Sequence, residues 1–100
     1  PETRFVAQFM GGHNVINLPE GEFAIRSDAV ATTAPKKGTV KGNVLSVEYQ
    51  GTHVAVVSMI DKSQEVIALV KDADFFANPH APGDQIGLIW DKQNLHQLSS

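Results

Sequence analysis

Alternating apolar and polar residues in the stretch from Gly38 to Ile60 predict two β-strands joined by a turn at Gly51. Apolar residues of the first strand occupy even positions as far as Val44 and odd positions from Leu45 onward. Because side chains alternate between the two faces of a strand, this change of phase predicts a bulge or coil next to Gly42. A long bent strand followed by a hairpin and further strands is typical of a small barrel.

Shorter alternating or apolar runs predict further strands on both sides of this hairpin. They cover residues 14–18, 22–26, 65–71, 85–90 and 94–98. The first two form a leading hairpin, and the continuously apolar run 65–71 suits a strand that is buried on both faces or crosses between two sheets. The predicted fold class is therefore all-β: an OB-like, five-stranded, partly open barrel over residues 38–100, with a leading short helix and a β-hairpin.

Helical segments are predicted between the strands. Residues 1–10 carry apolar side chains at helical spacing (Phe5, Val6, Phe9, Met10), and a helix this short must dock on another surface. Residues 27–30 predict one helical turn capped by Ser27 or Asp28, and residues 31–37 predict a loop. Residues 72–78, ended by Pro79, predict a short helix that plugs the barrel.

The predicted core takes alternate apolar side chains from four strands. Its members are Val44, Val47, Val54, Val56, Ile67, Leu69, Ile86 and Leu88. Trp90, at the end of an alternating strand, is predicted to belong to the core or to close one end of the barrel.

Composition agrees with one globular domain. The chain has 100 residues, 42% of them hydrophobic and 19% charged, and a formal net charge of -3. This charge gives no electrostatic footprint for nucleic acid, and the sequence has one Tyr and one Trp, so no nucleic-acid partner is expected. Cysteine is absent, which fits a reducing compartment, and neither a membrane-length apolar run nor a signal peptide is visible.

Catalytic motifs are not found in the sequence. It lacks a phosphate-binding loop, a dinucleotide fingerprint and a nucleophile elbow, so this chain is not expected to be an enzyme and no catalytic or cofactor-binding residue is predicted. The four histidines lack metal-ligand spacing, and no metal site is predicted. The candidate ligand or interface contacts are Arg26, Asp28, Lys36 and Lys37, with the cations gathered near one end of the barrel; the alternative is a solvated loop.

Five segments, taken in order, resemble a known family. Residues 5–11 (FVAQFMG) with Asn14 are similar to the segment that joins the ATPase domain of bacterial ABC importer subunits to a C-terminal accessory domain. Residues 25–30 (IRSDAV) resemble the next element of that family. The glycines and valines of 38–44, the run 83–90 (GDQIGLIW) and Leu95 resemble the frame of the transport-associated OB (TOBE) domain. Ser27 and Asp28 replace the family's Pro and Glu, which weakens any role carried over from that element.

The resemblance implies a single accessory domain of a longer subunit, with residues 1–12 as the end of a linker helix. ATP and Mg would bind in the ATPase domain of that parent, which would be the enzyme. The implied partners are this ATPase domain, a second copy of the subunit and, indirectly, permease subunits at the cytoplasmic side of the bacterial inner membrane. The pattern favours importers of the polyamine, iron, sulfate or phosphonate type, and the binding signature of molybdate domains is not visible. The implied function is regulation and dimerisation; the alternatives are an oxyanion or polyamine sensor and a nucleic-acid-binding OB domain.

Overall fold

A computed structural model describes residues 12–98 of the chain. The helix predicted over residues 1–10 and the segment FVAQFMG therefore lie outside the described residues. The described elements are β1 (His13–Leu18), β2 (Gly21–Arg26), η1 (Ser27–Ala29), β3 (Ala31–Thr33), η2 (Pro35–Lys37), β4 (Val40–Tyr49), β5 (His53–Met59), β6 (Glu65–Lys71), α2 (Asp72–Ala77), β7 (Gln85–Ile89), η3 (Lys92–Asn94) and β8 (His96–Gln97).

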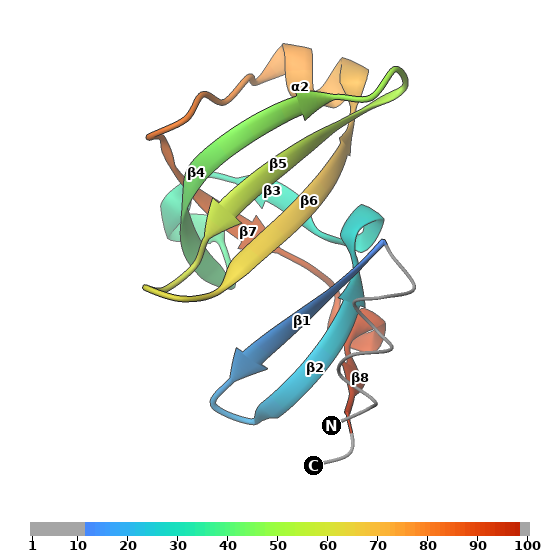
Figure 1. The fold of residues 1–100 in the computed structure, drawn as a ribbon, viewed down its shortest axis with the longest axis vertical. Helices are drawn as coiled ribbons and strands as arrows, with labels where there is room; N and C mark the ends of the chain where they lie inside the picture. Colours follow the sequence, from blue (N-terminus) through green and yellow to red (C-terminus); the bar gives the residue numbers. More distant parts are fainter. Residues whose placement is uncertain (1–11, 99–100) are drawn as a thin grey trace.

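The strands form two antiparallel sheets (Figure 1). A five-stranded sheet has the order β3-β7-β4-β5-β6, and a smaller one has the order β1-β2-β8. The larger sheet curls so that its edge strands β3 and β6 come into contact without forming a described ladder, which makes it a partly open barrel. The all-β, OB-like prediction is confirmed.

One of the five strands that form the barrel differs from the prediction. Residues 31–33, predicted as loop, form β3 and pair with β7, whereas the last strand, β8, pairs with β2 of the leading hairpin. β8 is also shorter than predicted, because η3 takes up residues 92–94. The short turn η1 forms as predicted, but neither Ser27 nor Asp28 caps it with a side-chain hydrogen bond. A three-residue strand next to a proline carries too little periodicity to be found by pattern.

The predicted change of phase in β4 is a β-bulge. The register with β5 slips between Val44 and Ser46, so that Leu45 and Ser46 are both exposed and the inward face resumes at Val47. Gly42 is not at the slip but two residues before it, facing inward: a Cβ built there would lie 3.1 Å from Cβ of Ser58. The glycine makes room for β5, and the bulge bends the strand.

Two side-chain amides hold the small sheet against the free edge of β6. The amide of Asn14 donates to the carbonyl of Ile67 and accepts from its N–H, both at 2.8 Å. The amide of Gln64 accepts from the N–H of Asn17 at 2.7 Å and donates to its carbonyl at 3.1 Å. Each amide thus replaces one residue of a neighbouring strand and covers backbone groups that an edge strand would leave open. We call Asn14 and Gln64 the amide clamps.

Asp61 fixes the second clamp in its position. Its Oδ2 accepts from the Gln64 side chain at 2.8 Å, and its Oδ1 accepts from the backbone N–H groups of Ser63 and Gln64. These hydrogen bonds, above all the one from the Gln64 side chain, lower the pKa of the Asp61 carboxyl. The carboxylate therefore stays ionised, and an acceptor, at neutral pH.

The core lies inside the barrel and under the small sheet. Its buried members are Ile16, Ile25, Val30, Val44, Val54, Val56, Val66, Ala68, Phe75, Ile86 and Leu88. Five of the eight predicted core residues are among them, and Val47 is partly buried against them. The prediction is wrong for β6: Val66 and Ala68 point inward, whereas Ile67 is 37% exposed and Leu69 is half-buried. The strand is thus not buried on both faces. Trp90 is half-buried against the core.

The helix α2 follows β6 and ends before Pro79, as predicted. Phe75 is 2% exposed and belongs to the core, whereas its neighbour Phe76 is 62% exposed. Phe76 stacks on Tyr49 with ring centroids 5.9 Å apart and an angle of 11° between the rings. One aromatic residue of the helix therefore anchors it, and the other lies on the surface.

Candidate ligand and partner sites

Arg26 and Asp28 form an exposed ion pair at the start of η1. The guanidinium is bidentate: Nη2 donates to Oδ2 at 2.8 Å, and Nε donates to Oδ1 at 3.0 Å. The hydrogen bond from Arg26 lowers the pKa of the Asp28 carboxyl, against a smaller opposite effect of burial. The Arg26 guanidinium is thus paired with a carboxylate of its own chain.

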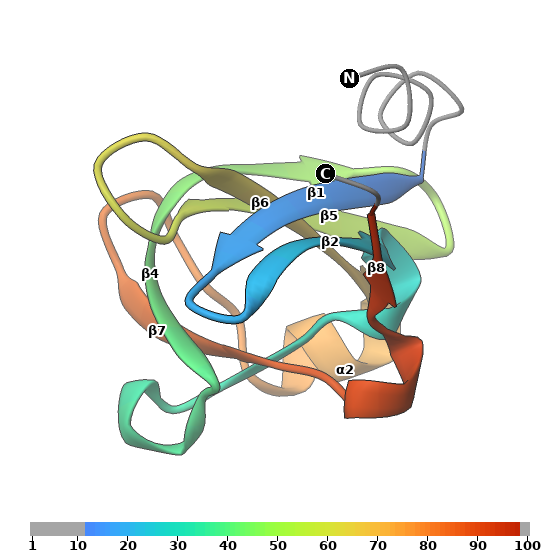
Figure 2. The ribbon, with the colours of Figure 1, turned by 90° about the horizontal axis from the view of Figure 1, so that it is seen from below.

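Lys36 and Lys37 lie elsewhere. They belong to η2, which packs against β7 and β4, whereas η1 packs against β6, and Figures 1 and 2 show the two short turns on opposite sides of the molecule. The prediction that Arg26 gathers with the two lysines near one end of the barrel is wrong. The sheet curls between them, which a pattern along the chain does not reveal.

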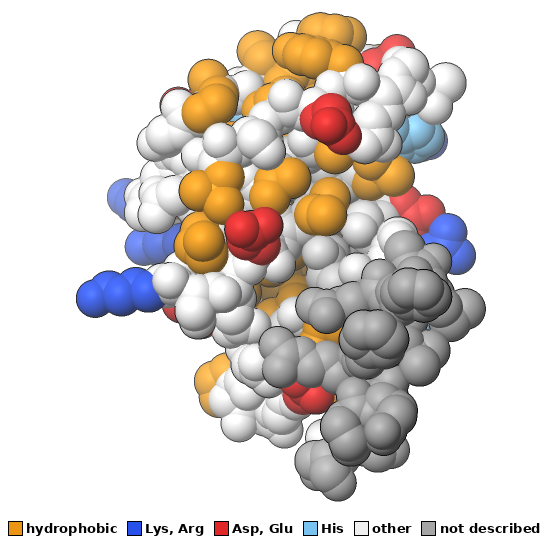
Figure 3. Space-filling view, in the orientation of Figure 1, with side chains coloured by type: hydrophobic (Ala, Val, Ile, Leu, Met, Phe, Trp, Pro, Cys, Tyr) orange, Lys and Arg blue, Asp and Glu red, His pale blue; other side chains and the backbone are white. Residues whose placement is uncertain are grey.

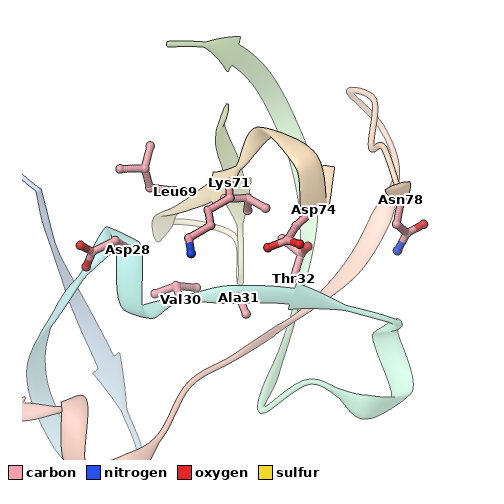
Figure 4. A pocket seen from close by; sticks show the side chains of 9 residues that line it. Asp28, Val30, Ala31, Thr32, Leu69, Lys71, Asp74 and Asn78 are labelled. Atoms are coloured by element: carbon pink, nitrogen blue, oxygen red, sulfur yellow. The ribbon is translucent and has the colours of Figure 1, made fainter. Parts of the chain in front are cut away.

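A pocket opens where the barrel fails to close, between β3 and η1 on one side and β6 and α2 on the other (Figure 4). Its volume is about 340 Å³. The apolar part of its lining comes from Val30, Ala31, Leu69 and Val70, and the polar part from Asp28, Thr32, Lys71, Asp74 and Asn78. We call it the seam pocket.

The charges of the seam pocket are two carboxylates and one ammonium. Lys71 reaches into the pocket, and Asp74 lies beside Thr32 (Figure 4). Within residues 12–98, neither Lys71 nor Asp74 forms an ion pair. Thr32 is fixed by a 3.1 Å hydrogen bond to Nε2 of His80. The pocket thus offers a carboxylate and an ammonium that are free to meet a charged ligand, above an apolar floor.

Of the predicted contact residues, Asp28 alone lines the seam pocket. Sequence reasoning missed Lys71, Asp74 and Asn78, which lie in one stretch at the end of β6 and along α2, and Thr32, which lies in β3. The strand and helix carrying Lys71 and Asp74 were predicted, but the missed strand β3 supplies the opposite wall.

A second hollow lies between the small sheet and the barrel, with a volume of about 700 Å³. Its lining includes Phe23, Val40, Trp90 and Leu95, with Glu20 and Lys92 as the charged members. Trp90 therefore closes this end of the barrel only in part, since it is half-buried and borders the hollow.

Over the described range, no three His, Cys, Asp or Glu side chains come together as a metal site. In the same range, no helix is long and apolar enough to cross a membrane.

The chain belongs to the TOBE domain family: the model of that family matches residues 23–98. It is also similar to the spermidine/putrescine import ATP-binding protein PotA of Bacillus thuringiensis (strain Al Hakam) and of Bacillus anthracis. Each is 26% identical to this chain over 98 residues, which cover 94% of the chain and 30% of the relative. The chain thus spans less than a third of the length of these relatives.

The fold has a counterpart among solved structures. The cytoplasmic molybdate-binding protein ModG, with molybdate bound, superposes with a TM-score of 0.64 at 13% identity, over 75% of this chain and 60% of that protein. At this identity the likeness concerns the fold, and it agrees with a TOBE-type barrel.

Proposed function

We propose that this chain is the accessory domain of the ATP-binding subunit of an ABC importer, and that it regulates and dimerises this subunit. The observation that carries the proposal is the match to 30% of the length of two import ATP-binding proteins by a chain that folds as a TOBE domain. Its sequence carries no nucleotide-binding motif. ATP, Mg and the hydrolytic residues belong to another part of the subunit, and this domain acts on them through contacts.

Regulation by contacts requires that these contacts differ between the states of the transporter. The partners in this proposal are the ATPase domain of the same subunit, a second copy of the subunit and, indirectly, the permease, at the cytoplasmic face of the bacterial inner membrane. The exposed charged side chains Arg26, Asp28, Lys36 and Lys37 are the proposed levers. Since Arg26 and Asp28 lie on η1 and the lysines on η2, they would serve two different contacts.

The test compares ATPase rates of the reconstituted transporter, with and without transport substrate. Its variants are the parent subunit, a truncation that lacks this domain, and the triple change of Arg26, Lys36 and Lys37 to alanine. We expect the truncation to keep a basal rate and the stimulation by substrate to change in both variants, while the melting temperature of the isolated triple variant stays the same. Equal stimulation in all three would reject regulation and leave a structural spacer.

A second candidate function is the sensing of a small ligand, and the seam pocket favours it. Asp28 is already paired with Arg26, so Asp74 is the carboxylate left to bind an amine and Lys71 is the ammonium left to bind an oxyanion. The apolar floor of Val30 and Ala31 suits an alkyl chain. The names of the relatives in Bacillus point to spermidine and putrescine as the amines to try.

Calorimetry on the chain with spermidine, putrescine, sulfate and molybdate tests this candidate. For an amine, Asp74→Asn should weaken binding by about tenfold, or 1.4 kcal/mol, while Asp72→Asn, on the same helix but outside the lining, should not. Lys71→Met should strengthen amine binding and abolish oxyanion binding. If neither the amines nor the oxyanions produce a heat of binding, the hypothesis that this domain senses a small ligand is rejected.

A further inference from the structure

The edge of β6 that is turned away from β5 carries the N–H and C=O groups of alternate residues. Asp72, directly after the strand, donates its N–H to the carbonyl of Thr52 at 3.0 Å, so the even-numbered residues bond to β5. The odd-numbered residues then face the free edge, because hydrogen-bonded and open pairs alternate in an antiparallel ladder. The amide of Asn14 binds both groups of Ile67 on that edge. The N–H and C=O of Leu69, two residues further on, therefore face the same way.

Leu69 presents its backbone to the seam pocket. It belongs to the lining, and its side chain points away from the pocket in Figure 4, so its backbone is the part that borders the pocket. Both η1 and β3 contact β6, but within residues 12–98 no hydrogen bond joins either of them to Leu69. The pocket thus contains a backbone donor and a backbone acceptor that are open to a polar ligand.

One free charge of each sign lies in the same pocket. Lys71 reaches into it, and Asp74 lines it from α2. The other carboxylate, Asp28, is engaged by Arg26, and Figure 3 shows an acidic and a basic group in contact on the side where η1 lies. Neither a pure cation nor a pure anion suits both free groups, because a polyamine would be repelled by Lys71 and an oxyanion by Asp74.

A ligand that carries one charge of each sign suits both groups. An α-amino acid has a carboxylate, which needs donors, and an ammonium, which needs acceptors, and the pocket offers a charged and a backbone group for each. The floor of Val30 and Ala31 is apolar and suits an aliphatic side chain. The volume of about 340 Å³ is at the small end of the range for ligand pockets, about 300 to 1,000 Å³, which favours a single amino acid over a peptide.

We propose that the seam pocket binds a free aliphatic α-amino acid in its zwitterionic form. The proposal rests on the ligand-sensing candidate of the proposed function and names the ligand class of that site. Lys71 and the N–H of Leu69 bind the carboxylate, and Asp74 and the C=O of Leu69 bind the ammonium. The aliphatic side chain lies on Val30 and Ala31.

The test titrates the 100-residue chain with leucine and with two analogues that each lack one charge. Isocaproate lacks the ammonium and isoamylamine lacks the carboxylate, while all three keep the same branched chain. We expect calorimetry to show leucine binding at least about tenfold more tightly than either analogue. In heteronuclear NMR spectra, the amide signal of Leu69 should shift as leucine is added, whereas that of Ile67, already bound by Asn14, should not.

Two variants test the two charges separately. Asp74→Asn should weaken the binding of leucine by about tenfold without weakening that of isocaproate. Lys71→Met should weaken the binding of leucine by a similar factor without weakening that of isoamylamine. Asp72→Asn is the matched control: it removes a carboxylate from the same helix, outside the pocket lining, and should leave all three dissociation constants unchanged. Melting curves verify that the variants are folded.

Three results would overturn the proposal: neither heat nor NMR shifts on adding leucine, leucine binding no tighter than both analogues, or leucine binding that both variants leave intact. If spermidine or an oxyanion binds in such a case, the sensing function stands with another ligand. If no ligand binds at all, the sensing function fails as well, and regulation is judged separately by the ATPase rates.

Discussion

Replacing Phe75 by alanine is expected to reduce the free energy of unfolding by about 3 to 5 kcal/mol. The ring is 2% exposed and lies in the barrel core with Val54, Val66 and Ala68. Its loss leaves a cavity at the plugged end of the barrel and releases α2, a helix of 6 residues that packing must hold in place. Since small domains are stable by about 5 to 15 kcal/mol, this loss is a large share of the total stability. Urea unfolding followed by circular dichroism measures the change.

Phe76→Ala is the control for this prediction. It makes the same substitution one position later in the same helix, so the change in helix propensity is the same. The ring of Phe76 is 62% exposed and contributes its stacking on Tyr49, so a loss of about 1 kcal/mol or less is expected. Equal losses for the two variants would contradict the role of Phe75 as the residue that anchors α2 in the core.

Replacing Asn14 by aspartate should reduce the stability by about 2 to 4 kcal/mol at neutral pH. Asn14 is 5% exposed, and its amide satisfies both backbone groups of Ile67. A carboxylate of the same shape still accepts from the N–H, but it cannot donate to the carbonyl, and it buries a charge beside that oxygen. Chemical unfolding of both proteins at pH 7 measures the difference.

The deficit of this variant should depend on pH in a definite direction. Burial and the nearby carbonyl disfavour the charged form, so the pKa of the new carboxyl is raised in the folded state above its unfolded value. Between these two values the folded chain binds more protons, so stability falls as pH rises and recovers as pH is lowered. Asn17→Asp, on the same strand with an exposed side chain, is the control and should show no such recovery. A deficit that does not change with pH would contradict the role of the Asn14 amide as a donor.

The alternation of apolar and polar residues was sufficient to predict a strand and its inward face where one face of the strand is clearly apolar. The alternation in β4 and β5 located the hairpin, and the change of phase located the bulge to within a few residues. In β6 every residue from Val66 to Val70 is apolar, so the pattern carried no information about which face is inward. Only the pairing with β5 decides it, and that pairing sends Ile67 and Leu69 outward.

The candidate sites could not be predicted in full, because they are formed by contacts between segments that are far apart in the sequence. Asp28 was found because it lies in a recognisable turn, but the seam pocket needs β3 opposite β6. The partner of Arg26 was two residues away and was still missed, since charges near each other in sequence are common on solvated turns. The two helical phenylalanines show the same limit: one is core and one is surface, yet both satisfy the same pattern.

The amide clamps have a consequence for where this domain can be cut. The family match begins at residue 23, inside β2, and a recombinant protein drawn to that boundary would lose β1 and Asn14 together. β2 would then lack its neighbour on one side, and the carbonyl and N–H of Ile67 would be bare on an edge whose outer face is already apolar. An uncovered apolar edge is a template for pairing with other chains, so such a protein is expected to precipitate. The smallest stable unit is thus expected to be larger than the matched range 23–98, because it must include the Asn14 side chain.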